Sequence, residues 1–289
     1  SGFGSVFKNV GSLTNAGFEF ALSSINVDRS NFQWTTDFNI SSNRNEITDL
    51  GGERLISGVN AFIEGQPAGA FFMLEYRGSD PNTGNPVYWD GFKEVVVNND
   101  SEYNNLLESS RAVQGNPNPR FFGGLTNSMS MGRFDLDFTF QFVQGVDVYW
   151  ETGEFIANSG FALYGQTADQ VDRWYNAADG GEYPRLNPNV ENPQSSSRWL
   201  VDGSYIRLNT LTFGYRLPDQ WVQNLGMRYF SLYVGGQNLF TISDYPGYDP
   251  DVGYVDPNGG TIAQNINRGI DFFTAPQPRI ITTGLKIGF

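Results

Sequence analysis

The sequence contains no cysteine and no histidine among its 289 residues. A disulfide, a thiolate zinc site, a catalytic thiol and a histidine-based triad are therefore excluded for this chain alone. Cations are scarce too, because 18 lysine and arginine residues stand against 31 acidic residues, a net charge of −13. This balance argues against a protein that binds nucleic acid or an anionic membrane surface, since both need a basic face.

Long apolar runs are also missing. The longest lies near residues 70–74, far short of the roughly 20 residues that a transmembrane helix needs. A helical membrane protein is thus excluded, but a β-barrel is not, because its alternating strands have a polar average composition. The chain starts without an initiator methionine or a signal peptide. We expect it to be part of a longer polypeptide.

What the sequence does contain is apolar and polar residues in strict alternation, the pattern of a β-strand with two unlike faces. The apolar face of residues 134–142 consists of Phe134, Leu136, Phe138, Phe140 and Phe142. Residues 31–42 repeat the pattern, and so do the last nine residues. The apolar residues there include Ile281, Leu285, Ile287 and Phe289. In a membrane barrel, we predict that these four residues and the five named above face lipid.

Seven strands are predicted in all, and their connections alternate in length. The predicted strands are residues 17–27, 31–42, 120–130, 134–142, 204–217, 228–240 and 281–289. The fifth of them alternates less cleanly, which suggests a bulge. Short connections at one end and long loops at the other are typical of an outer-membrane barrel. We therefore predict an all-β fold in which about seven strands form part of an antiparallel transmembrane β-barrel with long loops at one end.

The loops are expected to hold little regular structure. One helix is predicted at residues 167–178, capped by Thr167 and ended by glycines. A helix of one or two turns is predicted in the tight connection at residues 218–226, also ended by glycine.

Several segments resemble the C-terminal part of the SusC/RagA family of TonB-linked outer-membrane proteins. They are residues 9–20, 34–41, 78–88, 115–127, 202–218, 236–240, 245–252 and 278–289, and the most specific is DGSYIRLNTLTFGYRLP at 202–218. Their order and spacing run along the whole chain. The resemblance implies that residues 1–289 supply about seven C-terminal strands of a large antiparallel transmembrane β-barrel with long extracellular loops, of the plugged 22-stranded class. The plug and the N-terminal strands would lie outside this chain.

The resemblance also implies a function: an importer subunit that forms barrel wall and extracellular vault for the uptake of oligosaccharides or peptides. A SusD-like lipoprotein would cap its mouth, and TonB would engage from the periplasm through regions outside this chain. Membrane lipid and the remaining barrel would be its other neighbours. No enzymatic residue and no resident cofactor are implied. Two alternatives stay open: a structural or scaffolding barrel of the same family, and a secreted all-β glycan-binding or hydrolysing domain.

Two loop clusters of carboxylates have the oxygen ligands that Ca²⁺ prefers. Asp249, Asp251 and Asp256 form the first, and the second contains Asp80 and Asp90. Neither matches the EF-hand pattern, and the same residue types are ordinary turn formers, so turn chemistry is the alternative reading.

The long loops also carry aromatic residues that could stack on sugar rings, pack on a partner or form small loop cores. They are Trp89, Tyr149, Trp150, Trp174, Tyr175 and Trp199. Glu151 and Glu154 flank a glycine and could be taken for a glycosidase pair. Such a pair needs a fixed carboxylate separation across a bound sugar, which loop sequence cannot specify.

Overall fold

Seven long strands form one antiparallel sheet in the computed structural model, which describes residues 11–157, 165–177, 181, 183–187, 195–252 and 267–289. Their order is β1-β2-β10-β11-β14-β15-β16. The bounds are β1 Ser12–Arg29, β2 Phe32–Asp49, β10 Phe121–Met131, β11 Phe134–Gln144, β14 Tyr205–Arg216, β15 Tyr229–Ile242 and β16 Ile280–Gly288. The seven predicted strands are confirmed, and β1 and β2 extend further than the alternation indicated.

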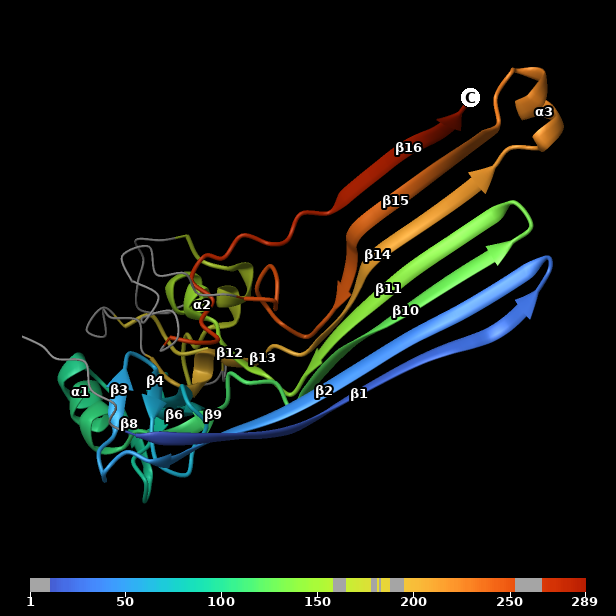
Figure 1. The fold of residues 1–289 in the computed structure, drawn as a ribbon. Helices are drawn as coiled ribbons and strands as arrows, with labels where there is room; N and C mark the ends of the chain where they lie inside the picture. Colours follow the sequence, from blue (N-terminus) through green and yellow to red (C-terminus); the bar gives the residue numbers. More distant parts are fainter. Residues whose placement is uncertain (1–10, 158–164, 178–180, 182, 188–194, 253–266) are drawn as a thin grey trace, which may run out of the picture.

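The short connections all lie at one end of this sheet. Two-residue turns join β1 to β2 and β10 to β11, and the second contains Gly132 at φ 59°, a conformation that glycine adopts without strain. Helix α3, Asp219–Asn224, occupies the β14–β15 connection, as predicted. The long connections, residues 50–120, 145–204 and 243–279, meet at the opposite end (Figure 1).

The strand register places one apolar face across the whole sheet, because residues paired in an antiparallel ladder point to the same side. Phe140 of β11 pairs with Leu125 of β10 and Leu208 of β14, and Leu125 pairs in turn with Phe38 of β2. Leu285 of β16 joins the same face through its pair with Leu232. The opposite face carries the polar residues of the alternation.

The predicted bulge lies in β14. The register shifts between Leu208 and Thr210 against β15, and between Thr139 and Phe140 on the other side. Asn209 is the extra residue, and its amide donates to Gln141 Oε1 at 3.2 Å. The bulge keeps Leu208 and Leu211 on the apolar face although they are three positions apart, an odd spacing that would place them on opposite faces of a regular strand.

The long connections contain far more regular structure than expected. Their short strands are β3 Leu55–Ser57, β4 Asn60–Phe62, β5 Ala70–Met73, β6 Glu75–Ser79, β7 Pro86–Trp89, β8 Glu94–Val96, β9 Ala112–Gly115, β12 Asp147–Tyr149 and β13 Leu200–Asp202. They form sheets β3-β4-β5-β9, β6-β7-β8 and β12-β13. The helices are α1 Asp100–Ser109 and α2 Glu151–Ile156, with 3₁₀ turns η1 Ala168–Asp172 and η2 Ser197–Trp199. The prediction of nearly structureless loops was wrong, because strands of three to five residues show no readable period.

The three connections share one core. Phe71 and Met73 come from the first, Tyr149 and Trp199 from the second, and Ile270 from the third. A second cluster packs Tyr88 and Tyr103 with their neighbours inside the first connection. Buried apolar side chains from three separate segments make this region one folded unit, which we call the loop body, comprising the described parts of residues 50–120, 145–204 and 243–279.

The helix predicted at residues 167–178 was wrong. Only the 3₁₀ turn η1 forms, Thr167 makes no side-chain cap, and residues 178–180 lie outside the described part. Tertiary contacts hold the following segment extended: Trp174 donates from Nε1 to Pro81 O at 3.0 Å, and its ring covers Gly84. These contacts override the helical pattern of the sequence. Among the described residues, no helix combines the length and the apolar content needed to cross a bilayer.

Candidate functional site

The nine predicted lipid-facing residues lie on or next to the apolar face of the sheet. Phe134 is 43% exposed and Ile281 is 71% exposed, whereas Leu136, Phe138, Phe140 and Phe142 are half-buried by their neighbours. Leu285 and Ile287 lie on β16, and Phe289 follows it with 80% of its surface exposed. An exposed apolar surface across seven strands calls for an apolar neighbour. Contact of these residues with lipid stays a prediction.

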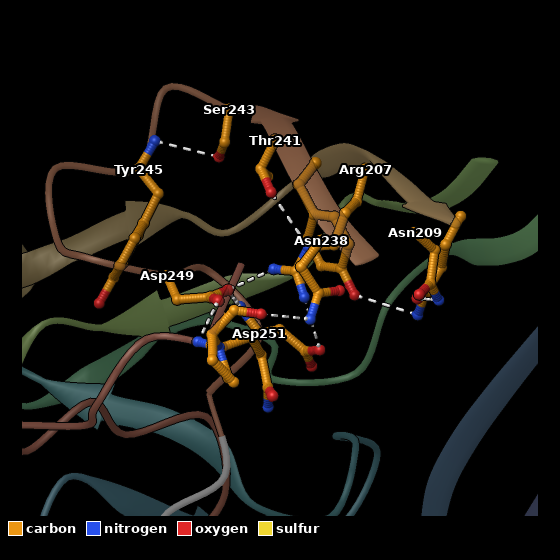
Figure 2. Close-up of polar contacts among 12 residues, drawn as sticks. Arg207, Asn209, Asn238, Thr241, Ser243, Tyr245, Asp249 and Asp251 are labelled. Carbon is orange, nitrogen blue, oxygen red and sulfur yellow. Dashed lines mark hydrogen bonds and ion pairs between the residues drawn. The ribbon is translucent and has the colours of Figure 1, made fainter. Parts of the chain in front are cut away.

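Two residues of the first carboxylate cluster, Asp249 and Asp251, contact a buried arginine on the polar face of the sheet (Figure 2). Arg207 of β14 is 3% exposed and ion-pairs with Asp249 and, at 3.3 Å, with Asp251. Its Nε donates to Thr241 Oγ1 of β15 at 3.0 Å. Asp249 also accepts from the backbone N–H groups of Asp251 and Gln277. Arg207 therefore links the third long connection to strand β14 of the seven-stranded sheet.

A calcium ion at Asp249 and Asp251 would have to compete with Arg207 for their oxygens. The third predicted ligand, Asp256, lies outside the described residues, and the described residues contain no group of three or more acidic side chains arranged to hold a metal. In the second cluster, Asp80 accepts from the N–H groups of Asn82 and Thr83. Asp90 accepts likewise from Phe92 and Lys93, bonds that lower the pKa of its carboxyl. These are turn contacts. A calcium site stays a prediction.

Two of the six aromatic candidates, Trp150 and Trp199, line a cavity of about 520 Å³ in the loop body. Their rings meet edge to face with centroids 6.4 Å apart. Trp150 lies at the start of α2 and Trp199 in η2, and the backbone N–H of Trp150 donates to Trp199 O at 2.8 Å. Arg198, adjacent to Trp199, and Asp169 of η1 also line the cavity.

The other four aromatic candidates lie apart from this cavity. Tyr149 is 1% exposed in the shared core. Trp89 lies beneath the guanidinium of Arg77, and Tyr175 beneath that of Arg173. Trp174 joins two segments of the loop body through its bond to Pro81.

Glu154 is a buried carboxyl in the loop body. It accepts hydrogen bonds from the hydroxyl of Tyr149 and, at 3.3 Å, from that of Ser195. Burial raises its pKa to about 7, and the charge of Glu151 acts in the same direction. The pKa of Glu151 is raised by burial as well. Glu151 lines a different cavity, beside Arg111.

Comparison with known proteins finds relatives that match the whole chain. No family model matches the chain. TonB-dependent receptor P3 of Formosa agariphila is 34% identical over all of this chain, and TonB-dependent receptor P26 of the same organism is 31% identical. TonB-dependent receptor SusC of Bacteroides thetaiotaomicron is 24% identical over 98% of the chain. The chain is thus similar in sequence, along its whole length, to TonB-dependent receptors, with SusC among them. It spans about 30% of the length of these curated relatives.

The fold of this chain is also similar to solved structures. The RagAB peptide transporter superposes on all of this chain with a TM-score of 0.82 at 22% identity, and the chain covers 31% of that structure. The same importer in its open-open state gives 0.81. The all-β fold predicted from the alternation is thereby confirmed, since the chain has the fold of the part of the RagAB transporter that it matches.

Sequence reasoning selected Trp150 and Trp199 but missed the charged residues beside them. Arg198 and Asp169 stand in segments without a motif, and only the fold brings them to the cavity wall. Arg207 carried a usable signal, since it is the one charged residue in the stretch Tyr205–Tyr215 and must find an anionic partner if buried.

Proposed function

We propose that the chain forms part of the wall and the extracellular loops of an outer-membrane, TonB-dependent importer. The observation that carries this is the strand register, which gives the sheet one continuous apolar face and one polar face while all three long connections emerge at one end. An apolar outer face, a polar inner face and long loops on one side are the properties of a transmembrane barrel. The homology to TonB-dependent receptors supports the same function.

In this proposal residues 1–289 are the C-terminal part of the barrel, and the plug and remaining strands belong to the same polypeptide. The polar face lines the conduit, and the loop body helps to form the vault above it. A SusD-like lipoprotein closes the vault, and TonB supplies energy from the periplasm. The cargo is an oligosaccharide or a peptide. The chain itself breaks no bond, so it is not an enzyme.

The test uses the full-length protein in its native host. Membrane fractionation is expected to place it in the outer membrane, and extraction should require detergent. Deletion of its gene, or of tonB, should abolish growth on the cargo, and a plasmid copy should restore it. If the full-length protein is soluble and monomeric in buffer without detergent, its assignment as a transmembrane barrel is wrong. If the protein is in the outer membrane but the deletion strain grows normally on every tested glycan and peptide, the import function is wrong and a scaffolding function is favoured.

A further inference from the structure

Helix α3 carries two exposed apolar side chains at the short-turn end of the sheet, the end away from the loop body (Figure 1). Trp221 is 63% exposed and Leu225 is 66% exposed, and they lie one helical turn apart on the same side. Val222 between them is 2% exposed. The opposite side of the helix carries polar residues such as Gln220 and Asn224. The helix is therefore amphipathic, and the described part of the chain leaves much of its apolar side uncovered.

Hydrogen bonds hold the start of α3 at the edge of the apolar face. The backbone N–H of Leu217, just before the helix, donates to Phe230 O of β15 at 3.0 Å. Arg133 of the β10–β11 turn donates from Nη1 to Leu217 O at 2.8 Å. Leu217 follows Tyr215 by two positions, and Tyr215 lies on the apolar face because it pairs with Phe134. The helix thus begins directly after the last residues of the apolar face.

Arg29 places a positive charge at the same edge of the sheet. It pairs with Phe32, which pairs with Met131, and Met131 pairs with Phe134. All four side chains therefore point to the apolar side. Arg29 is exposed, and its side chain makes no hydrogen bond or ion pair within the described part of the chain. The side chain of Arg228, which lies between α3 and β15, is exposed and equally unpaired there.

The strand carboxylates at this end lie on the other face. Asp28 and Asp135 directly neighbour Arg29 and Phe134 in their strands, so their side chains point to the polar face. Asp135 has its own cation there, Arg216, at 3.3 Å. The three long connections hold 23 acidic and 10 basic residues, which accounts for the whole net charge of −13. The short-turn end of the apolar face therefore offers arginine to an anion, with no carboxylate among the described strand residues of that face.

These features fit the headgroup layer of an anionic phospholipid membrane. A tryptophan prefers the boundary between headgroups and acyl chains, and a leucine beside it extends into the chains. An arginine at the end of an apolar face reaches the headgroups and binds phosphate oxygens with its planar guanidinium. A zwitterionic headgroup would add an ammonium group, for which the strands supply no carboxylate on this face. A headgroup with a net negative charge is therefore favoured.

We propose that α3 lies in the headgroup boundary of the membrane leaflet at the short-turn end, with Trp221 and Leu225 against the acyl chains and with Arg29 and Arg228 on the phosphates of anionic phospholipids. This rests on the proposed function, which places the sheet in a membrane. It gives α3 a role in lipid binding, by which the helix fixes the depth of this part of the barrel in the bilayer.

The first experiment measures lipid selectivity by electron spin resonance. The full-length protein is placed in phosphatidylcholine vesicles with spin-labelled phosphatidylglycerol or spin-labelled phosphatidylcholine, and it is expected to prefer phosphatidylglycerol. The double variant Arg29→Gln/Arg228→Gln should lose most of this preference, since each cation at an anionic membrane surface contributes roughly a factor of five in binding. The matched control is Lys286→Gln, because Lys286 pairs with Ser231 on the polar face of the same end. It should keep the preference.

The second experiment locates Trp221 by fluorescence quenching in vesicles of phospholipid brominated close to the headgroup or close to the chain end. The chain has six tryptophans, and the difference between the unmodified protein and Trp221→Phe isolates the signal of Trp221. This side chain is exposed, so the substitution leaves the core intact. The isolated signal should be quenched more strongly by bromine close to the headgroup. Trp89→Phe, in the loop body, is the control and should leave that part of the quenching unchanged.

The outcomes separate this proposal from the function on which it rests. A barrel that enters vesicles but shows no preference for phosphatidylglycerol, or keeps it in the double variant, overturns the headgroup contacts. An isolated Trp221 signal that neither brominated lipid quenches overturns the placement of α3, which would then face water or a periplasmic protein. A full-length protein that is soluble without detergent overturns the barrel itself.

Discussion

At the residue scale, the negative charge of Asp249 is neutralised by its ion pair with Arg207. Asp249 is 8% exposed, and Arg207 is its cationic partner in the described structure. Arg207→Met would leave a buried carboxylate unpaired. We expect this to cost about 3–5 kcal/mol of unfolding free energy.

The measurement is denaturant unfolding of the full-length protein in lipid vesicles. The control is Arg44→Met, because Arg44 is 81% exposed and pairs with Glu46 at 3.1 Å on the surface, a pair worth no more than about 1 kcal/mol. Equal losses in the two variants would contradict the assignment. Replacing Asp249 by Leu in the Arg207→Met background should recover much of the loss, since no charge then stays buried.

Glu154 makes the loop body sensitive to pH. Its folded pKa of about 7 lies above the ordinary value of 4.5 because the carboxyl is buried. Below about pH 4.5 it is protonated whether the loop body is folded or not. Between 4.5 and 7 the folded form holds the proton and the unfolded form does not, so stability falls as pH rises, by about 3 kcal/mol in total. Above pH 7 the contribution is lost and the dependence flattens.

Hydrogen exchange of residues 148–157 at pH 5 and pH 8 checks this. Exchange should be faster at pH 8 after correction for the intrinsic rate, and Glu154→Gln should remove most of the difference. Glu108→Gln, at an exposed position on α1, is the control and should retain the full difference. A Glu154→Gln variant with unchanged pH dependence would show that another group titrates.

At the element scale, the pairing of β15 with β16 places tyrosine rings over glycines. Tyr233 pairs with Gly284 and Tyr229 with Gly288, and a Cβ on either glycine would overlap the facing ring. Gly284→Ala should force the ring of Tyr233 aside and cost about 1–3 kcal/mol. Gly235→Ala, where the nearest atom is an ordinary 3.5 Å away, should be tolerated. Thermal unfolding in detergent distinguishes them, and equal midpoints would refute the packing argument.

The two faces of β11 should respond differently to charge. Phe138 lies near the middle of the strand on the apolar face, and Thr139 beside it lies on the polar face. Arginine at a lipid-facing position near the bilayer midplane costs about 2–4 kcal/mol, whereas arginine in an aqueous lumen costs little. Refolding into lipid vesicles should therefore be impaired for Phe138→Arg and near normal for Thr139→Arg. The reverse order would mean that the faces are assigned the wrong way round.

At the scale of the whole molecule, the loop body should respond as one unit. Ile270, from the third connection, packs in the core with Phe71 of the first and Tyr149 of the second. Ile270→Ala is expected to cost about 2–5 kcal/mol. Hydrogen exchange should accelerate in residues 59–73 and 148–157 as well as around the substitution. Acceleration confined to residues 267–275 would show that the connections fold independently.

The sequence predicts the seven-stranded sheet well and the loop body poorly, and the reason is physical. A strand such as residues 134–142 has unlike environments on its two sides, so its alternation can be read directly. The loop body packs against neighbours on several sides, and its short strands, such as β5 with four buried residues, show no alternation. Its cavity joins Trp150, Asp169 and Tyr248 from separate segments. Aromatic content could nominate the tryptophans, but only the fold brings Asp169 and Tyr248 to them.

The shared core of the three long connections limits how these connections can be exchanged between related proteins. A single connection exchanged with that of a relative would arrive with apolar side chains shaped for other neighbours, and Phe71, Tyr149 and Ile270 would no longer fit together. Chimaeras should therefore succeed when all three connections are transplanted as a set and fail when they are moved singly. During evolution the loop body would then change by joint replacement of all three connections, or by substitutions at cavity-lining positions such as Tyr248.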